Sequence, residues 1–265
     1  MVVGTDRMSD GPNIPGVQMR EVGDSDVTGF VMVVDALADI VAQHDTLYDW
    51  AAGLPQPRAL RGRAPVYVAA LPNTHDTIVV RHGWHGGLLA PVTGDRFRLP
   101  TRAPLEMWQS YALRQVGIPT SEVLGFARYP AGPGLRRIDV VTRFVPDAYD
   151  LGMIAAGLAP HIDATDAMSA TIALLVQLAA HGVIHPDLNV KNILLRRTTG
   201  QIPEAMVIDI DVVRWDATRP PALTMRANVT RLIRSMRKWR ANFGCDMADE
   251  RLARFERDAL AATPA

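Results

Sequence analysis

The chain reads His-Gly-Val-Ile-His-Pro-Asp-Leu-Asn-Val-Lys-Asn-Ile-Leu-Leu at residues 181–195 and Val-Ile-Asp-Ile-Asp at residues 207–211. Before the first stretch, apolar residues recur at helical spacing. They predict a helix over residues 163–181, which Asp163 or Thr165 can cap and Gly182 can end. A helix therefore leads directly into a polar loop.

Two short apolar runs follow this loop and predict a β-hairpin. The expected strands cover residues 192–195 and 205–208, on either side of Thr-Thr-Gly at 198–200. Asp209 comes 22 residues after Asp187 in the sequence. We expect the hairpin to return Asp209 beside Asn192.

The residue types in this segment point to phosphoryl transfer. Asp187 and Asn192 have the Asp-x-x-x-x-Asn spacing of a kinase catalytic loop. Asp187 would accept or orient the proton of the attacking hydroxyl. Asn192 and Asp209 would hold Mg²⁺ through oxygen atoms, and Asp211 would assist. The spacing alone is a weak signal, since Asp187 could be a turn residue and Asp209 a strand-end cap. The complete order of helix, loop, hairpin and acid is far more demanding.

The rest of the chain separates a strand-rich portion from a helical one. Early elements are predicted as helices over 27–50 and 101–116, strands over 66–71, 77–81 and 137–145, and loop over 53–65. Later residues read mainly as helix, most clearly over 226–243. The sequence thus predicts an α+β, two-lobed fold. A mobile tail covers residues 1–28, a strand-rich ATP-binding N-lobe 29–145, and a mainly helical C-lobe with the catalytic loop and acceptor site 146–265.

Composition limits the partners and the compartment. The net charge is zero, so nothing favours binding to nucleic acid. Cys245 is the single cysteine, which excludes an internal disulfide. No stretch resembles a membrane-spanning helix or a secretion signal. We expect a cytoplasmic protein.

These residues resemble the lipopolysaccharide kinases that phosphorylate 3-deoxy-D-manno-octulosonic acid (Kdo) of lipid A precursors. The specific matches are His185-x-Asp187-Leu-Asn with Asn192-Ile-Leu, and Ile208-Asp-Ile-Asp; shorter matches extend over about residues 58–240. The resemblance implies a protein-kinase-like fold, ATP as donor, Mg²⁺ as cofactor and a sugar hydroxyl of a lipid-linked acceptor. It makes Asp187 the catalytic base and Asn192 and Asp209 metal ligands.

The same resemblance assigns the ATP-binding residues of the N-lobe, with three departures from the kinase pattern. Gly62 would lie over the phosphates, and Glu106 matches the helix glutamate of kinases. Lysine occurs only at positions 191 and 238, so the usual phosphate-binding lysine is absent. Arg81 is the best substitute, whereas an alternative register would put Pro91 there. The phosphate loop is poor in glycine, and Pro186 stands where a basic residue often occurs.

Two other functions remain open at this point. Aminoglycoside or choline phosphotransferases share a His-x-Asp-x-x-x-x-Asn loop and a later Ile-Asp strand, so the acceptor could be a small molecule. A pseudokinase would explain the missing lysine and the thin phosphate loop, but the intact Asp187, Asn192 and Asp209 oppose it. His82-x-x-His85 suggests a metal pair, but turn residues explain it better because no other ligands accompany it.

The C-terminal helix has an apolar face and a basic side. The apolar residues are Val229, Leu232, Ile233, Met236, Trp239 and Phe243, and the basic ones are Arg231, Arg234, Arg237, Lys238 and Arg240. Such a helix either packs on the core with solvated charges, or contacts anionic lipid or the anionic acceptor itself. Contact with lipid would place the protein peripherally on the cytoplasmic face of the inner membrane.

Overall fold

The computed structural model describes residues 14, 17–18, 30–31, 34–60, 65–85, 94–159, 161–197, 202–245 and 247–264. The chain divides into two compact units. The first comprises Met1–Tyr111 and Glu122–Phe144, and the second comprises Ala112–Ser121 and Val145–Ala265. Most of the predicted tail, residues 1–28, lies outside the described residues.

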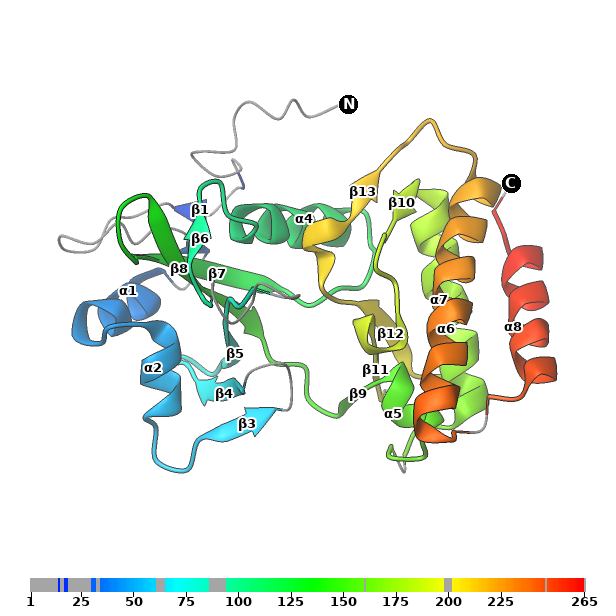
Figure 1. The fold of residues 1–265 in the computed structure, drawn as a ribbon, viewed down its shortest axis with the longest axis horizontal. Helices are drawn as coiled ribbons and strands as arrows, with labels where there is room; N and C mark the ends of the chain where they lie inside the picture. Colours follow the sequence, from blue (N-terminus) through cyan, green and yellow to red (C-terminus); the bar gives the residue numbers. More distant parts are fainter. Residues whose placement is uncertain are drawn as a thin grey trace. The chain divides into compact units, whose positions relative to one another are not determined.

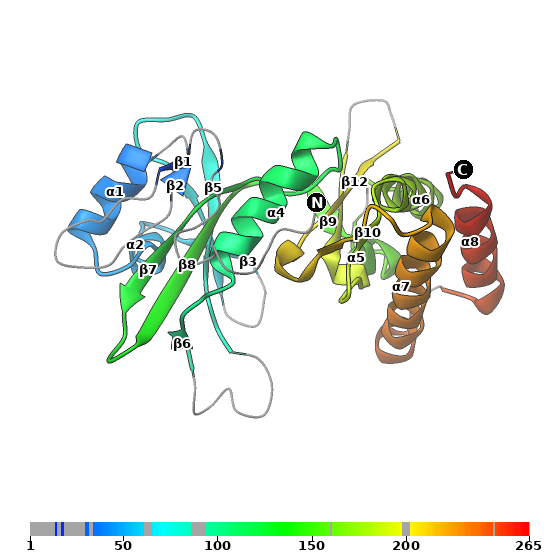
Figure 2. The ribbon, with the colours of Figure 1, turned by 90° about the horizontal axis from the view of Figure 1, so that it is seen from above.

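An antiparallel sheet forms the centre of the first unit. Its strands, in spatial order, are β1 (Val17–Gln18), β2 (Phe30–Val31), β7 (Val123–Pro130), β8 (Leu135–Arg143), β5 (Thr77–His82), β4 (Val66–Ala70) and β3 (Arg58–Leu60), and β6 (Phe97–Arg98) also pairs with β8. The hairpin of β7 and β8 is its longest part, and its two strands run side by side in Figure 2.

Helices cover both faces of this sheet. Helices α1 (Val34–Gln43) and α2 (Leu47–Ala52) bury their apolar residues against one face, where Val141 lies. Helix α4 (Ala103–Gln115) packs its first turns against the other face, where Val140 lies. Neighbouring residues of a strand point to opposite faces, so β8 contributes to both cores.

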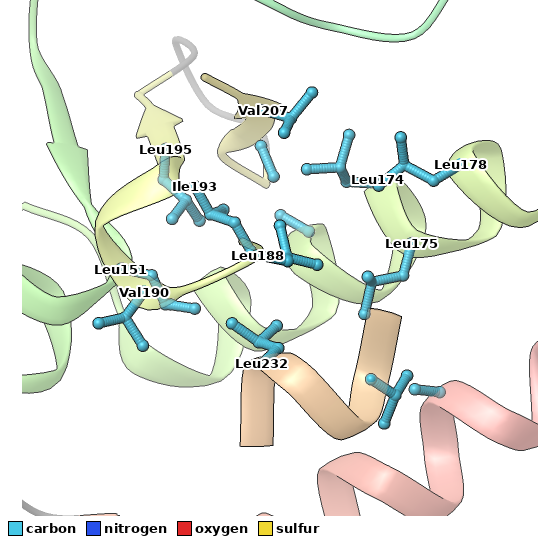
Figure 3. Packing of buried hydrophobic residues seen from close by; sticks show 14 of the residues in the cluster. Leu151, Leu174, Leu175, Leu178, Leu188, Val190, Ile193, Leu195, Val207 and Leu232 are labelled. Carbon is cyan, nitrogen blue, oxygen red and sulfur yellow. The ribbon is translucent and has the colours of Figure 1, made fainter. Parts of the chain in front are cut away.

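Helices and small sheets make up the described part of the second unit (Figure 1). The helices are α5 (Leu151–Ala155), α6 (Ala164–Ala180), α7 (Pro221–Phe243) and α8 (Asp249–Ala261). One sheet has the order β12 (Glu204–Val207), β11 (Ile193–Arg196) and β9 (Ala148–Asp150), and the other pairs β10 (Val183–Ile184) with β13 (Arg214–Trp215). Short 3-10 helices, η2 (Val190–Asn192) and η3 (Ile210–Val212), precede β11 and follow β12. Leucines of α6 meet Leu188, Ile193 and Leu232 in one apolar core (Figure 3).

This order of elements confirms the predicted α+β class, with a strand-rich unit and a mainly helical unit. Residues 163–211 also form the expected elements, because α6, η2, β11 and β12 follow one another along the chain. The turn predicted at 198–200 lies outside the described residues.

Two early predictions are wrong. Residues 27–50 do not form one helix, since strand β2 precedes α1 and Thr46 starts the separate helix α2 by capping it. The loop predicted over 53–65 contains β3, which pairs with β4. None of the helices in the described part of the chain is both long enough and apolar enough to span a membrane.

Candidate functional site

Gly182 turns the chain from α6 into the polar loop. Its φ is +64°, a backbone conformation that favours glycine. Its carbonyl oxygen accepts a hydrogen bond from the Asp216 N–H at 3.0 Å, and a Cβ at this position would lie 2.0 Å from the Asp216 carbonyl oxygen. Only glycine lets the two segments approach this closely, so the sequence signal for a helix end also marks a packing contact.

His185 is fully buried and links the loop to the residue before Asp209. Its Nε2 lies 3.1 Å from the carbonyl oxygen of Ile208, which can only accept, so Nε2 carries the proton. Burial lowers the pKa of His185 below its ordinary value, although Asp209 and Asp187 act in the opposite direction. His185 is therefore a neutral structural donor, and its Nδ1 has no hydrogen-bond partner among the described residues.

The loop places Asp187 and Asn192 against one another through the main chain. The Asn192 side-chain nitrogen donates to the carbonyl oxygen of Asp187 at 2.9 Å. Asn189 donates to the same oxygen at 2.9 Å and accepts from the Lys191 N–H at 2.9 Å. Because the Asn192 nitrogen is fixed in this way, its Oδ1 is the atom left to face a cation. The carboxylate of Asp187 is exposed.

Asp209 follows β12 after one residue, Ile208, which is hydrogen-bonded to the same loop. The Ile208 N–H donates to the Asn192 carbonyl oxygen at 3.0 Å, so the residue before Asp209 is bonded to the main chain of Asn192. Asp209 has φ 59° and ψ 49° and its side chain is exposed. A left-handed conformation outside glycine is uncommon and clusters at functional sites. The structure thus brings Asp209 to the same loop as Asn192.

The donor set fits magnesium bound together with a substrate. Among the described residues, no group of three or more His, Cys, Asp or Glu side chains could hold a metal ion alone. Mg²⁺ usually keeps several waters and takes one or two carboxylates plus substrate phosphates, so it does not need such a group. Asp209 and Asn192 could supply one carboxylate and one amide oxygen.

Side chains of helix α7 form hydrogen bonds with the main chain of the loop, which the sequence analysis did not predict. Asn228 accepts from the His185 N–H at 3.1 Å and donates to the Val183 carbonyl oxygen at 2.9 Å. Arg231 Nε donates to the Pro186 carbonyl oxygen at 3.0 Å, and the Ser235 hydroxyl accepts from the Val190 N–H at 3.1 Å. The assignment of Arg231 to a solvated basic side is therefore wrong. The available sequence signal is the pattern Asn-x-x-Arg-Leu-x-Arg-Ser at residues 228–235.

The apolar face of α7 differs from the prediction at its end. Val229, Leu232, Ile233 and Met236 are buried as expected, but Phe243 is 59% exposed. Its ring lies tilted against that of Trp239, whose Nε1 donates to the Gly152 carbonyl oxygen at 3.0 Å. The last turn of α7 therefore presents an aromatic residue to solvent.

Arg81 and Glu106 meet in the first unit. Arg81 lies on β5 and Glu106 on α4, and Nη2 of Arg81 is 2.6 Å and 2.7 Å from the two carboxylate oxygens. The Glu106 side chain is 11% exposed and that of Arg81 42%. Kinases place a strand lysine and a helix glutamate in such a pair. Gly62 and Pro91, the other residues predicted for this region, lie outside the described residues.

His82 is a buried strand residue rather than the turn residue that we expected. Its Nδ1 lies 2.6 Å from Asp139 and its Nε2 lies 3.1 Å from Asp95. Burial acts to lower the pKa of His82, but hydrogen bonds and charge from the two carboxylates outweigh it and raise the pKa above its ordinary value. Asp139 is fully buried and also accepts from the Tyr48 N–H and the Tyr129 hydroxyl. These residues form a structural network.

Comparisons with known proteins identify the family of the chain. A model of the lipopolysaccharide kinase (Kdo/WaaP) family matches residues 60–256. A search of curated proteins finds no match. A solved structure described as WaaP in complex with acyl carrier protein has 16% identity and a TM-score of 0.42 over 82% of this chain and 92% of that chain, a likeness too low to carry an argument. Because the family match spans most of the sequence and includes the whole loop and hairpin, the chain belongs to the lipopolysaccharide kinase (Kdo/WaaP) family, which implies phosphotransferase activity.

Proposed function

We propose that this chain transfers the γ-phosphoryl group of ATP, with Mg²⁺, to a sugar hydroxyl of Kdo in a lipopolysaccharide precursor. The proposal rests on two hydrogen bonds that connect the segments bearing Asp187, Asn192 and Asp209. The Asn192 side chain is bonded to the Asp187 carbonyl oxygen, and the Ile208 N–H to the Asn192 carbonyl oxygen. These bonds support a base and two metal ligands acting on one substrate.

Asp187 is the proposed catalytic base. Its exposed carboxylate would take the proton of the acceptor hydroxyl as the hydroxyl oxygen bonds to phosphorus and ADP leaves. Asn192 and Asp209 would hold the metal and thereby orient the donor phosphates. Bound Mg²⁺ would neutralise charge on the phosphate oxygens. Positioning and charge neutralisation account for most of the catalysis of this reaction.

Arg81 is proposed to hold the donor phosphates in place of lysine. Its guanidinium is fixed by both oxygens of Glu106, as a lysine would be in a kinase. Arginine binds phosphate through a planar fork rather than as a point charge, so the contacts would differ in geometry. Gly62 would approach the phosphates through its backbone.

ATP turnover with Mg²⁺ tests the catalytic proposal. Wild type should phosphorylate Kdo–lipid A, detected by mass spectrometry, and Asp187→Ala and Asp209→Ala should each lose at least about a hundredfold in kcat. Asp216→Ala is a matched control, because Asp216 is exposed and its carboxylate bonds to the neighbouring residues Thr218 and Arg219. Phosphorylation of amino sugars instead of Kdo would favour the aminoglycoside type. Wild-type turnover no greater than that of either site variant would indicate a pseudokinase.

We also propose a peripheral position on the cytoplasmic face of the inner membrane. Arg234, Arg237 and Lys238 are exposed on α7, and Phe243 is exposed at the end of the same helix. A basic helix surface with an aromatic residue suits anionic lipid headgroups.

Vesicle binding tests this position. Replacing Arg234, Arg237 and Lys238 by Ser should weaken binding to anionic vesicles, with no effect on zwitterionic ones. Replacing Arg251, Arg254 and Arg257 of α8 by Ser removes the same charge and is the control. Equal loss in both triple variants would show a non-specific charge effect and contradict the assignment to α7.

A further inference from the structure

Three polar residues on one face of α7 hold the main chain of the catalytic loop. Asn228, Arg231 and Ser235 are spaced by three and four residues, so they share a helix face. Their bonds reach Val183, His185, Pro186 and Val190, on both sides of Asp187. None of these bonds involves a side chain of the loop. Helix α7 therefore holds the main chain of the loop at four residues.

Of these three residues, Arg231 is the one that bonds to the residue directly before Asp187. Its Nε donates to the Pro186 carbonyl oxygen at 3.0 Å, and its Nη1 donates to the Ala227 carbonyl oxygen of its own helix at 3.0 Å. The rigid guanidinium thus joins a loop carbonyl to a helix carbonyl. Pro186 itself contributes no side-chain cation at the place where kinases often have one. Arg231 of α7 brings a guanidinium to the Pro186 carbonyl oxygen.

The two peptide planes that flank Asp187 are both held. The preceding plane contains the Pro186 carbonyl, which accepts from Arg231. The following plane contains the Asp187 carbonyl, which accepts from Asn189 and Asn192, and the Leu188 N–H, which donates to the His185 carbonyl oxygen at 3.1 Å. When both planes are fixed, the two soft dihedrals of Asp187 are fixed as well, and with them the direction of its Cα–Cβ bond.

We infer that Arg231 is a positioning residue for Asp187, which it aims through the Pro186–Asp187 peptide without touching the substrate. The inference rests on the proposed function, because it assigns a role in the reaction of Asp187. Loss of the Arg231 bond frees the preceding plane while leaving Asn192 and Asp209 in place. Turnover should therefore suffer more than nucleotide binding.

Three variants test this role: Arg231→Met, Arg231→Lys and, as control, Arg226→Met. Arg226 lies exposed on the same helix. We expect Arg231→Met to lower kcat roughly tenfold to a hundredfold, since small displacements of a reacting group have effects of this size. The KM for ATP should stay within about twofold under the same reasoning. Arg231→Lys, which keeps a donor, should recover part of kcat, and Arg226→Met should match wild type.

Hydrogen–deuterium exchange provides a readout independent of turnover. Exchange over residues 183–192 should accelerate in Arg231→Met and not in Arg226→Met, while the thermal midpoint of both variants stays near that of wild type. Faster exchange with unchanged kcat, or lower kcat with unchanged exchange, would overturn the positioning role. So would an equal loss of kcat in the Lys and Met variants. A wild type without turnover would refute the proposed function, whereas exchange would still decide whether Arg231 holds the loop.

Discussion

Gly182 ends helix α6 and also allows a close contact with the main chain of Asp216. Its left-handed conformation alone would cost a residue with a Cβ roughly 1–2 kcal/mol. A Cβ at this position would also lie 2.0 Å from the Asp216 carbonyl oxygen, which adds a clash with backbone that cannot easily move. We expect Gly182→Ala to lower the free energy of unfolding by more than the conformational cost, measured by urea denaturation.

Gly157 offers the matched control for this prediction. Its φ is +71°, but nothing lies within 4 Å of a Cβ placed there. Gly157→Ala should therefore lose only the conformational part, about 1–2 kcal/mol. Equal losses in the two variants would mean that the contact with Asp216 contributes nothing.

Arg81 is the residue on which donor binding depends in the proposed function. Arg81→Met removes the guanidinium that Glu106 fixes, and we expect kcat/KM for ATP to fall at least about tenfold. Arg81→Lys keeps the charge but not the planar fork, so it should lie between wild type and Met. Steady-state kinetics with varied ATP check this order. A Met variant with wild-type KM and kcat would exclude Arg81 from donor binding.

Thr46 explains why one predicted helix is two elements. Its hydroxyl accepts from the Asp49 N–H at 2.9 Å and donates to the Asp49 carboxylate at 2.7 Å, which starts helix α2. Thr46→Val keeps the shape and removes these bonds. We expect it to lower the free energy of unfolding by about 0.5–2 kcal/mol, the usual value of an N-cap. Thr46→Ser should retain most of the stability, and similar losses for Val and Ser would refute the cap.

Strands could be predicted from the sequence where one face of the strand is buried and the other is not. Strands that are buried on both faces or largely exposed were missed. The exposed and buried residues of β5 alternate, and its sequence predicted it. Strand β7 went unrecognised because residues 123–127 are all buried, which removes the alternation, and because its pairing shifts between Val123 and Gly125. Strand β3 is largely exposed and only three residues long, so it left no apolar signal.

The candidate site also contains residues that the sequence predicted and residues that it did not. Asp187, Asn192 and Asp209 could be predicted as site residues because their residue types and spacing form a motif along the chain. The α7 residues were not, because Arg231 acts on a backbone carbonyl 45 residues away, and such a bond leaves no paired side chain in the sequence. A side chain that binds a main-chain atom can fix the geometry of a site, but no residue type at the other end of the bond reveals it in the sequence.

At the scale of the whole molecule, each unit contains a buried histidine, and the surroundings shift the pKa values of the two histidines in opposite directions. In the first unit, His82 lies between Asp139 and Asp95, and its pKa is raised. In the second unit, His185 donates to a backbone carbonyl, and burial is the main cause of its lowered pKa. The ordinary value of both is 6.5. Acid and alkali should therefore weaken different units.

The sign of each effect follows from proton linkage. A raised pKa in the folded state means that His82 stabilises fully below about pH 6.5 and loses this contribution as the pH rises through its folded pKa. A lowered pKa means that His185 contributes fully above about pH 6.5 and loses its contribution as the pH falls through its folded pKa. Replacement by Gln removes the titration in each case.

Urea unfolding of wild type, His82→Gln and His185→Gln between about pH 5 and 8 checks these signs. The stability difference between wild type and His82→Gln should shrink as the pH rises above about 6.5, whereas that between wild type and His185→Gln should shrink as the pH falls below it. The remaining histidines are common to all three proteins, so their titration cancels in each difference. Because the two variants differ only in which unit loses its histidine, slopes of the same sign would contradict the two environments that the structure assigns.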